Sequence, residues 1–312
     1  MAVLNSTNAF LNQEINNLEA IITQVGVQET PLLSILMARG QVSPMSGIKV
    51  VWREESYDDN GTTPSGIKEG AEHVAGTKGT RTTRENTAQI FSKSVEVTGT
   101  AAAIAANGGA DGITALMARE MERRSIEIKK DLERSLFLST EKAEDGGSGR
   151  QMNGLLNLVV AEHTIDAESG KITKALIRDA VKKQWAAGSR GEKIMFLNSD
   201  QKDVIDDLYE ANAQQMYNVQ LQVGANAFGV SCTKIHTAYG DLILALSTDI
   251  PQGTVLIANI ADLELKRLRG FHTVNSGDGR DAEKQTIIGE YSVICRNRHS
   301  LTKIINLATE EE

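Results

Sequence analysis

The stretch from residue 95 to residue 154 decides the fold. It begins with the apolar run VEVTGTAAAIA (95–105), which predicts a short strand, and a glycine-rich break, NGG (107–109), follows. From Ile113 to Leu138 the chain has neither Pro nor Gly, which predicts one long helix. About 26 residues at 1.5 Å rise give a rod roughly 40 Å long, more than twice the usual helix, so it spans a domain instead of filling its centre. The glycine-rich loop DGGSG (145–149) ends the stretch.

Apolar residues recur along this predicted helix at spacings of four and three, which is one narrow helical stripe. We expect Met121, Ile128 and Leu132 to face the β-sheet of their own subunit, and Arg123, Lys130 and Arg134 to face water or a neighbour. The stripe is Ile113, Met117, Met121, Ile128, Leu132 and Leu136, with Ser125 filling the missing step. The other faces carry Arg119, Glu120, Glu122, Arg123, Arg124, Glu127, Lys129, Lys130, Asp131, Glu133 and Arg134.

Composition excludes several classes of protein. A chain of 312 residues with 40% hydrophobic content can bury a substantial core and could hold two modest domains. The net charge is −8, from 41 acids and 33 bases, and no run of five like charges occurs, which argues against nucleic-acid binding through a basic face. The sequence predicts no signal peptide and no membrane span. Cys232 and Cys295 suit reduced, buried thiols of a cytoplasmic protein better than a disulfide.

The first hundred residues predict arms more than a compact body. Residues 1–40 predict one or two helices, with Thr30-Pro31 opening the second and Gly40 ending it. Residues 47–57 alternate as a half-buried strand, and 81–98 form a second extended run. Between them, 61–80 is rich in glycine and almost free of apolar residues. This predicts a long two-stranded arm that rests on another subunit, because an isolated hairpin is marginally stable in water.

The remainder alternates helices and strands, so the fold class is α+β, with β-rich ends around a helical middle. A helix is expected over 172–187, stopped by Gly188, and another from 198–200 to Tyr209. The expected strands are 193–197, 230–235, 242–246, 254–259 (entered by a turn at 249–253), 263–268, 286–296 and 299–307.

No candidate for catalysis or ligand binding satisfies its pattern. GGSGR (146–150) ends in Arg where a nucleophile elbow needs Gly, and GSRGEK (188–193) lacks the spacing of a phosphate-binding loop. Cys232 and His236 have no further metal ligands nearby, and DGRD (278–281) lacks the closing Glu of a calcium loop. The histidines are scattered: His73, His163, His236, His272 and His299. We therefore predict no catalytic, cofactor-binding or metal-binding residues, and no enzyme.

The order of several short motifs resembles the major capsid protein of tailed bacteriophages, with its HK-97-like capsid fold. The motifs are ETPLL (29–33), Trp52 in the first strand of the arm, SKSVEVTGTA (92–101) entering the long helix, RQMNGL (150–155), DIPQGTVL (249–256) and GEY (289–291). Each motif is weak alone, but together they follow the family's order over nearly the whole chain.

This resemblance implies a phage major-capsid-protein fold, and the domain boundaries follow by analogy. We expect an N-terminal arm (1–45), an extended β-hairpin loop (46–97), a peripheral domain (98–175) with a spine helix at about 112–140, an axial domain (176–261) and a C-terminal return to the peripheral domain (262–312). The implied function is a structural subunit that self-assembles through hexamers and pentamers into the icosahedral head shell around double-stranded DNA.

The resemblance also implies partners and location: other copies of the chain first, then portal, scaffolding or decoration proteins, in a virion capsid made in the bacterial host cytoplasm. We expect no membrane partner and only non-specific proximity to the packaged DNA. Some relatives lose an N-terminal segment to a protease or cross-link Lys to Asn. We expect no cleavage here, and none of Lys68, Lys78 and Lys93 can be matched to the cross-linking position.

Two other functions stay open. A nanocompartment shell of the encapsulin type would share the fold, and it would be distinguished by a groove for cargo peptides and by neighbouring enzyme genes. A soluble enzyme of uncharacterised type would need titratable residues converging in a pocket, which the sequence does not offer.

Overall fold

The computed structural model describes residues 29–55, 66, 68–70, 72, 79–107, 116–144, 148–213, 233–276 and 281–308. The chain divides into two compact units, one formed by 1–28, 92–128 and 272–288, the other by 29–91, 129–271 and 289–312. Some expectations lie outside the described residues. These are the helix before Glu29, most of the 61–80 segment, the glycine-rich break after Asn107, the start of the long helix, residues 145–147, the strand residues 230–232 with Cys232, His73, Lys78 and residues 278–280 of the predicted polar turn.

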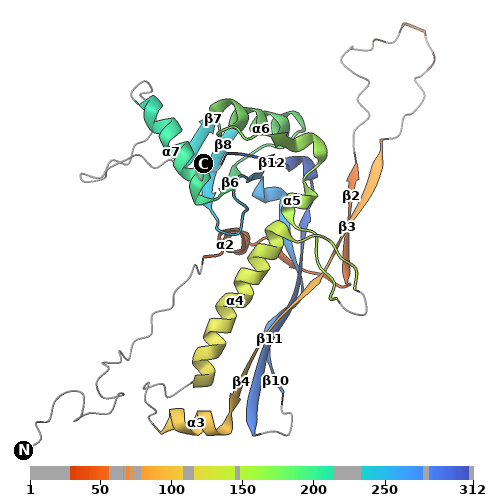
Figure 1. Ribbon diagram of the computed structural model, residues 1–312. Helices are drawn as coiled ribbons and strands as arrows, with labels where there is room; N and C mark the ends of the chain where they lie inside the picture. Colours follow the sequence, from red (N-terminus) through yellow and green to blue (C-terminus); the bar gives the residue numbers. More distant parts are fainter. Residues whose placement is uncertain are drawn as a thin grey trace, which may run out of the picture. The chain divides into compact units, whose positions relative to one another are not determined.

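The second unit contains a mixed sheet whose described strands run in the order β5-β12-β9-β6-β8-β7. Four of these strands, β6, β7, β8 and β12, are labelled in Figure 1. All five residues of β6 are buried, as expected of a central strand covered on both faces. Its partners are parallel β8 and antiparallel β9, so the sheet is mixed. The strands are β5 (Thr164–Asp166), β6 (Lys193–Leu197), β7 (Lys234–Thr237), β8 (Gly240–Leu246), β9 (Val255–Ala258) and β12 (Leu301–Ile305).

Helices α6 (Lys174–Ala186) and α7 (Ser199–Ala213) pack their apolar residues against one face of this sheet, where Ile177 and Ile205 join Met195 in a single buried cluster. The Thr173 hydroxyl caps α6 by accepting a hydrogen bond from the Leu176 N–H at 3.2 Å. Gly188, with φ of +88°, ends it. The helices and strands predicted between 172 and 259 are confirmed within the described residues.

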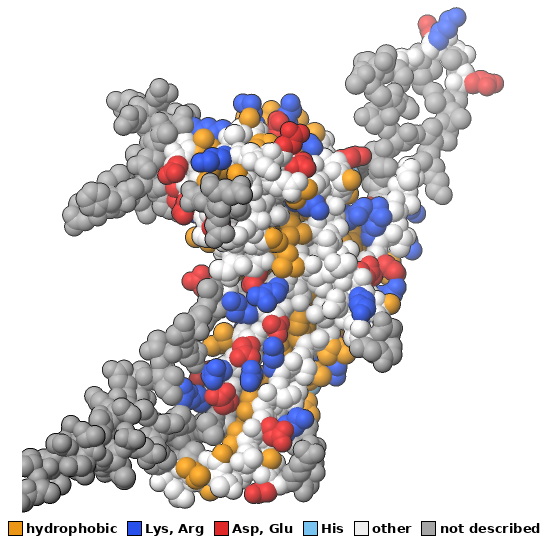
Figure 2. Space-filling model, in the orientation of Figure 1, with side chains coloured by type: hydrophobic (Ala, Val, Ile, Leu, Met, Phe, Trp, Pro, Cys, Tyr) orange, Lys and Arg blue, Asp and Glu red, His pale blue; other side chains and the backbone are white. Residues whose placement is uncertain are grey.

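The long helix is confirmed as α4 (Leu116–Leu138). Ile128, Leu132 and Leu136 are buried as the stripe predicted, and Phe137 packs edge-on against Phe196 of β6 with ring centroids 5.3 Å apart. Acidic and basic side chains gather along the visible face of α4 (Figure 2). The expectation that Glu133 belongs to a charged outer face of the helix is wrong, because its side chain is fully buried.

The apolar run 95–105 is not one strand. Strand β4 (Gln89–Thr98) ends inside it and helix α3 (Gly99–Ala106) begins. The alanine run favours a helix, and the Thr98 hydroxyl accepts a hydrogen bond from the Ala101 N–H at 3.3 Å. Gly99 lies close to Asp281, because a Cβ at Gly99 would be 2.2 Å from a carboxylate oxygen of Asp281 and that side chain would have to move.

The predicted two-stranded arm is confirmed as β2 (Lys49–Glu55) and β3 (Arg81–Thr87), paired antiparallel from Lys49↔Thr87 to Glu55↔Arg81. The extended run 81–98 is nevertheless divided, since Ala88 separates β3 from β4, which belongs to another sheet. That sheet has the order β1-β10-β11-β4, with β1 (Val42–Pro44), β10 (Leu263–Ser276) and β11 (Ala282–Cys295).

Three kinds of short element complete the chain. Helix α2 (Pro31–Ala38) begins at the predicted Thr30-Pro31 and is followed by Gly40, whose φ is +68°. A single turn, α5 (Leu155–Leu158), follows the long helix. Short 3-10 turns are η1 (Ala161–His163), η2 (Ile260–Asp262) and η3 (Arg298–Ser300).

Candidate functional site

Long-range contacts converge at the root of the two-stranded arm, where β3 ends. Asn86 is fully buried there, and its side-chain N–H groups donate to the Val293 carbonyl at 2.7 Å and the Asn153 carbonyl at 3.0 Å. Its Oδ1 accepts from the backbone N–H of Thr87 at 2.9 Å and of Asn153 at 2.7 Å. One amide therefore ties the end of the arm to β11 and to the segment 150–155, with its donors and acceptor satisfied.

Arg150 makes a second connection at the same place. Its Nε donates to the carbonyl of Ala88 at 2.7 Å, and its terminal nitrogens pair with Glu144 at 3.0 Å and with buried Glu290 at 3.4 Å. Glu290 also pairs with Arg269. The segments 150–155 and 289–291, far apart in the sequence, thus meet at the break between β3 and β4.

Two glycines of these segments are required by close packing. A Cβ on Gly154 would lie 2.7 Å from the carbonyl oxygen of Phe137, and one on Gly289 would lie 2.6 Å from the Phe271 ring. Real Cβ atoms essentially never show contacts so short, so any side chain at Gly154 would force the backbone apart.

We expect Asn86→Ala to lower the free energy of unfolding by about 1–3 kcal/mol, because its buried backbone partners lose their hydrogen bonds. Thr83→Ala is the matched control, since Thr83 lies on the same strand with an exposed side chain. Urea unfolding of the unassembled chain measures both, and similar losses in the two variants would contradict the anchoring role of Asn86.

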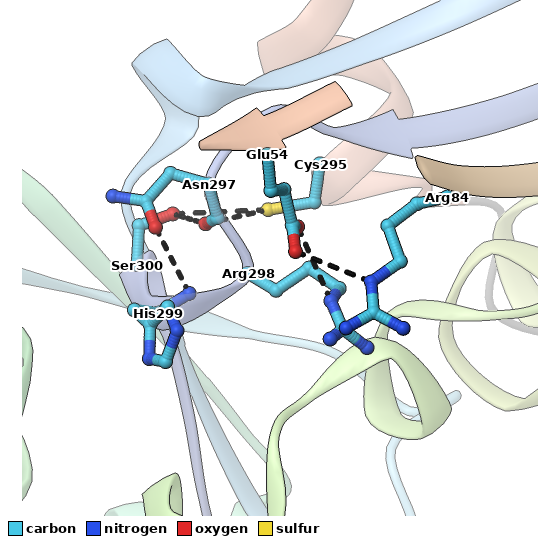
Figure 3. Close-up of polar contacts among 7 residues, drawn as sticks. All are labelled: Glu54, Arg84, Cys295, Asn297, Arg298, His299 and Ser300. Carbon is cyan, nitrogen blue, oxygen red and sulfur yellow. Dashed lines mark hydrogen bonds and ion pairs between the residues drawn. The ribbon is translucent and has the colours of Figure 1, made fainter. Parts of the chain in front are cut away.

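The base of the arm is also fixed by charge (Figure 3). The Glu54 carboxylate on β2 accepts from Arg84 Nε on β3 and from Arg298 Nε in η3, both at 3.2 Å. The turn that carries Arg298 is held internally. Asn297 Oδ1 accepts from the His299 N–H at 3.1 Å, and the Ser300 hydroxyl donates to the Asn297 carbonyl at 2.6 Å. The arm is therefore joined to the β11–β12 connection by an arginine of defined position.

Cys295 lies under this turn and donates its thiol to the Asn297 carbonyl at 3.0 Å. It is a free cysteine with no exposed surface. Burial raises its thiol pKa to about 12, so it stays protonated and unreactive at neutral pH. The expectation of a reduced, buried thiol is confirmed for Cys295.

Glu133 is a buried carboxylate that the sequence places among the charges of the long helix. Its two oxygens accept from the backbone N–H groups of Leu32 at 2.7 Å and Leu33 at 2.8 Å, at the start of α2. Thr30 makes no side-chain cap, so Glu133 supplies the cap from a hundred residues away. Burial is the largest effect on this carboxyl and raises its pKa from 4.5 to about 7, against the lowering effect of the two N–H bonds.

The free energy of unfolding should fall as pH rises from about 4.5 to about 7, because the folded state holds the Glu133 proton to higher pH than the unfolded state. Above about pH 7 the contribution of Glu133 to the free energy of unfolding no longer changes with pH. Glu133→Gln should remove this part of the pH dependence. Urea unfolding of both proteins at pH steps through the window measures it, and identical slopes would contradict the assignment.

The histidines that the structure describes have different surroundings. His163 and His299 do meet, with ring centroids 5.2 Å apart, and burial followed by repulsion from His299 lowers the pKa of His163. His236 pairs with Asp241 at 2.8 Å, and Cys232, four residues before it in the sequence, lies outside the described residues. Within the described part of the chain no three His, Cys, Asp or Glu side chains are grouped as metal ligands. Nor is any helix there long and apolar enough to cross a membrane.

Phage capsids, a GTA particle capsid and an encapsulin are among the solved structures similar to this chain. The capsid asymmetric unit of cyanophage A-1(L) aligns with a TM-score of 0.74 at 12% identity, covering 94% of this chain and 97% of that one. The capsid of a native GTA particle aligns with a TM-score of 0.63 at 11% identity, covering 98% of this chain and 100% of that one. The holo-SrpI encapsulin complex of Synechococcus elongatus PCC 7942 aligns with a TM-score of 0.60 at 12% identity, covering 100% of this chain and 98% of that one. At such identities these likenesses establish the fold alone.

The family is decided by sequence. A comparison with curated protein sequences gives no significant match. The model of the SU10 major capsid protein family, in contrast, matches residues 3–308. This match favours a phage head over an encapsulin compartment, which the shared fold cannot separate. The chain therefore belongs to the SU10 major capsid protein family and is a structural shell subunit of a tailed-phage head.

Proposed function

We propose that the subunit assembles as hexamers and pentamers that close an icosahedral shell around double-stranded DNA. The observation that carries this is the family match over residues 3–308. The two-stranded arm supports it, because β2 and β3 have no third strand among the described residues and a lone hairpin gains stability by resting on a neighbour. Head-to-tail contacts that close on rotation make rings.

The domain roles are part of the same proposal. Residues 46–97 are the extended loop, α4 lies in the spine at about 112–140, and 176–261 form the axial domain. The N-terminal arm is 1–45, the rest of the peripheral domain is 98–175, and 262–312 return to it. These boundaries rest on fold analogy.

The subunit works by assembly and has no catalytic turnover of its own. Its partners are first other copies, with portal, scaffolding or decoration proteins as further ones, and it is made in the bacterial host cytoplasm before entering the virion. A net charge of −8 suits a wall that does not hold the genome tightly.

Light scattering of the purified protein over a series of protein and salt concentrations tests the proposal. Assembly should be steep in protein concentration and weaken with salt, because exposed ion pairs are screened within about 8 Å at 0.15 M ionic strength. A saturable small-molecule site found by calorimetry, together with scattering that stays flat, would favour an enzyme instead.

A further inference from the structure

The two arginines at the base of the arm have terminal N–H donors that no described residue of the chain uses. We propose that the terminal nitrogens of Arg84 and Arg298 together bind a carboxylate from a neighbouring copy of the chain. The inference rests on the proposed function, since it requires that copies meet at the arm.

Each arginine uses only one edge internally. Arg84 and Arg298 both donate through Nε to Glu54, and among the described residues their Nη groups have no hydrogen-bond partner. These nitrogens reach solvent, although the side chains are only 38% and 19% exposed. The internal bonds thus hold the two guanidinium groups in place while their outer N–H donors stay available.

The charge at this point is unbalanced. Two guanidinium groups share one carboxylate, whereas the other ion pairs between β2 and β3 are one to one: Lys49 with Glu85 at 2.6 Å and Arg81 with Glu55 at 3.1 Å. Figure 3 shows the Arg84 and Arg298 guanidinium groups lying close together beyond the Glu54 carboxylate. A second anion placed against both would relieve their repulsion and complete their hydrogen bonds.

A carboxylate of another copy fits this site better than a DNA phosphate. The chain has 41 acidic and 33 basic residues, so every neighbouring copy brings a surplus of carboxylates. Val51, on the face of β2 opposite Glu54, is 55% exposed, so the arm also presents an apolar side chain of the kind found where protein surfaces meet.

The double variant Arg84→Lys, Arg298→Lys tests the proposal. Lysine can still pair with Glu54, so the melting temperature of the unassembled subunit should stay close to that of the wild type. A lysine ammonium that pairs with Glu54 cannot also present two outward N–H donors side by side, as an arginine guanidinium can. The protein concentration for half-maximal assembly should therefore rise about two- to fivefold, the range expected for losing an exposed ion pair. Arg81→Lys, on the same strand and paired with Glu55, is the control and should assemble as the wild type.

Assembly of the double variant at the wild-type concentration would overturn the proposal, and so would a defect that appears only when DNA is added. If wild type and Arg81→Lys both fail to assemble, the proposed function itself is wrong. Cryo-electron microscopy of wild-type shells gives an answer that does not depend on a variant's folding. A carboxylate of an adjacent copy within about 3.2 Å of Nη atoms of both arginines is expected, and a water, a free ion or a DNA phosphate there would refute the proposal.

Discussion

Leu132→Ala is expected to lower the free energy of unfolding of the unassembled subunit by about 2–5 kcal/mol. Leu132 is 1% exposed, and Leu136 and Phe137 on the following turn of α4 are fully buried. Removing its side chain leaves a cavity in a region where little can collapse, since α4 is a regular helix from Leu116 to Leu138. Chemical unfolding with two probes, fluorescence and circular dichroism, measures the loss.

Lys129→Ala is the matched control on the same helix, because Lys129 is exposed and its change should cost under about 0.5 kcal/mol. Lys130 is not used as the control, because its side chain is half-buried, although the sequence predicts that it faces water or a neighbour. Equal losses for Leu132→Ala and Lys129→Ala would mean that the apolar stripe of α4 is not a core face.

Deleting residues 61–80 should abolish assembly while leaving a folded, soluble subunit. The deletion joins Glu55 to Arg81 through the five residues 56–60, a connection of ordinary length for a hairpin, so the β2–β3 pairing can persist. The deleted segment is glycine-rich and nearly free of apolar residues, which suits an intersubunit clamp better than a part of the chain's own core.

The deletion variant is compared with wild type by sedimentation velocity and by urea unfolding. A subunit of unchanged stability that sediments only as small species is the expected result. Normal shells from the deletion variant would refute the clamp. A subunit that no longer unfolds cooperatively would show that the segment belongs to the fold of its own chain.

Local patterns predicted much of the fold. The lack of Gly and Pro from 113 to 138 with a single apolar stripe predicted α4, and the amphipathic pattern of 172–187 with Gly188 after it predicted α6 and its end. These elements could be recognised because their period, caps and stops lie within the segments themselves.

The features that sequence reasoning missed depend on partners far along the chain. The break at Ala88 is held by Arg150 and Asn86, and an extended run carries no local sign of it. Glu133 reads as one more charge on a charged helix, because its partners lie at Leu32 and Leu33. The alanine run before Asn107 is apolar enough for a buried strand, but alanine has the highest helix propensity, and the run forms α3.

The root of the arm was predicted only in its parts. The segments 150–155 and 289–291 were singled out by their order, yet nothing in the sequence paired Arg150 with Glu290. Likewise Glu54, Arg84 and Arg298 look like ordinary surface charges until the fold brings them together. Such long-range pairs need either a structure or co-varying positions in related sequences.

Electron microscopy of the purified protein at concentrations above the scattering threshold tests the central claim, self-assembly of this one chain into a shell, most directly. The account predicts closed particles of uniform size whose averaged images show icosahedral symmetry, formed without any other protein. Images that show only separate subunits at every protein and salt concentration would contradict it.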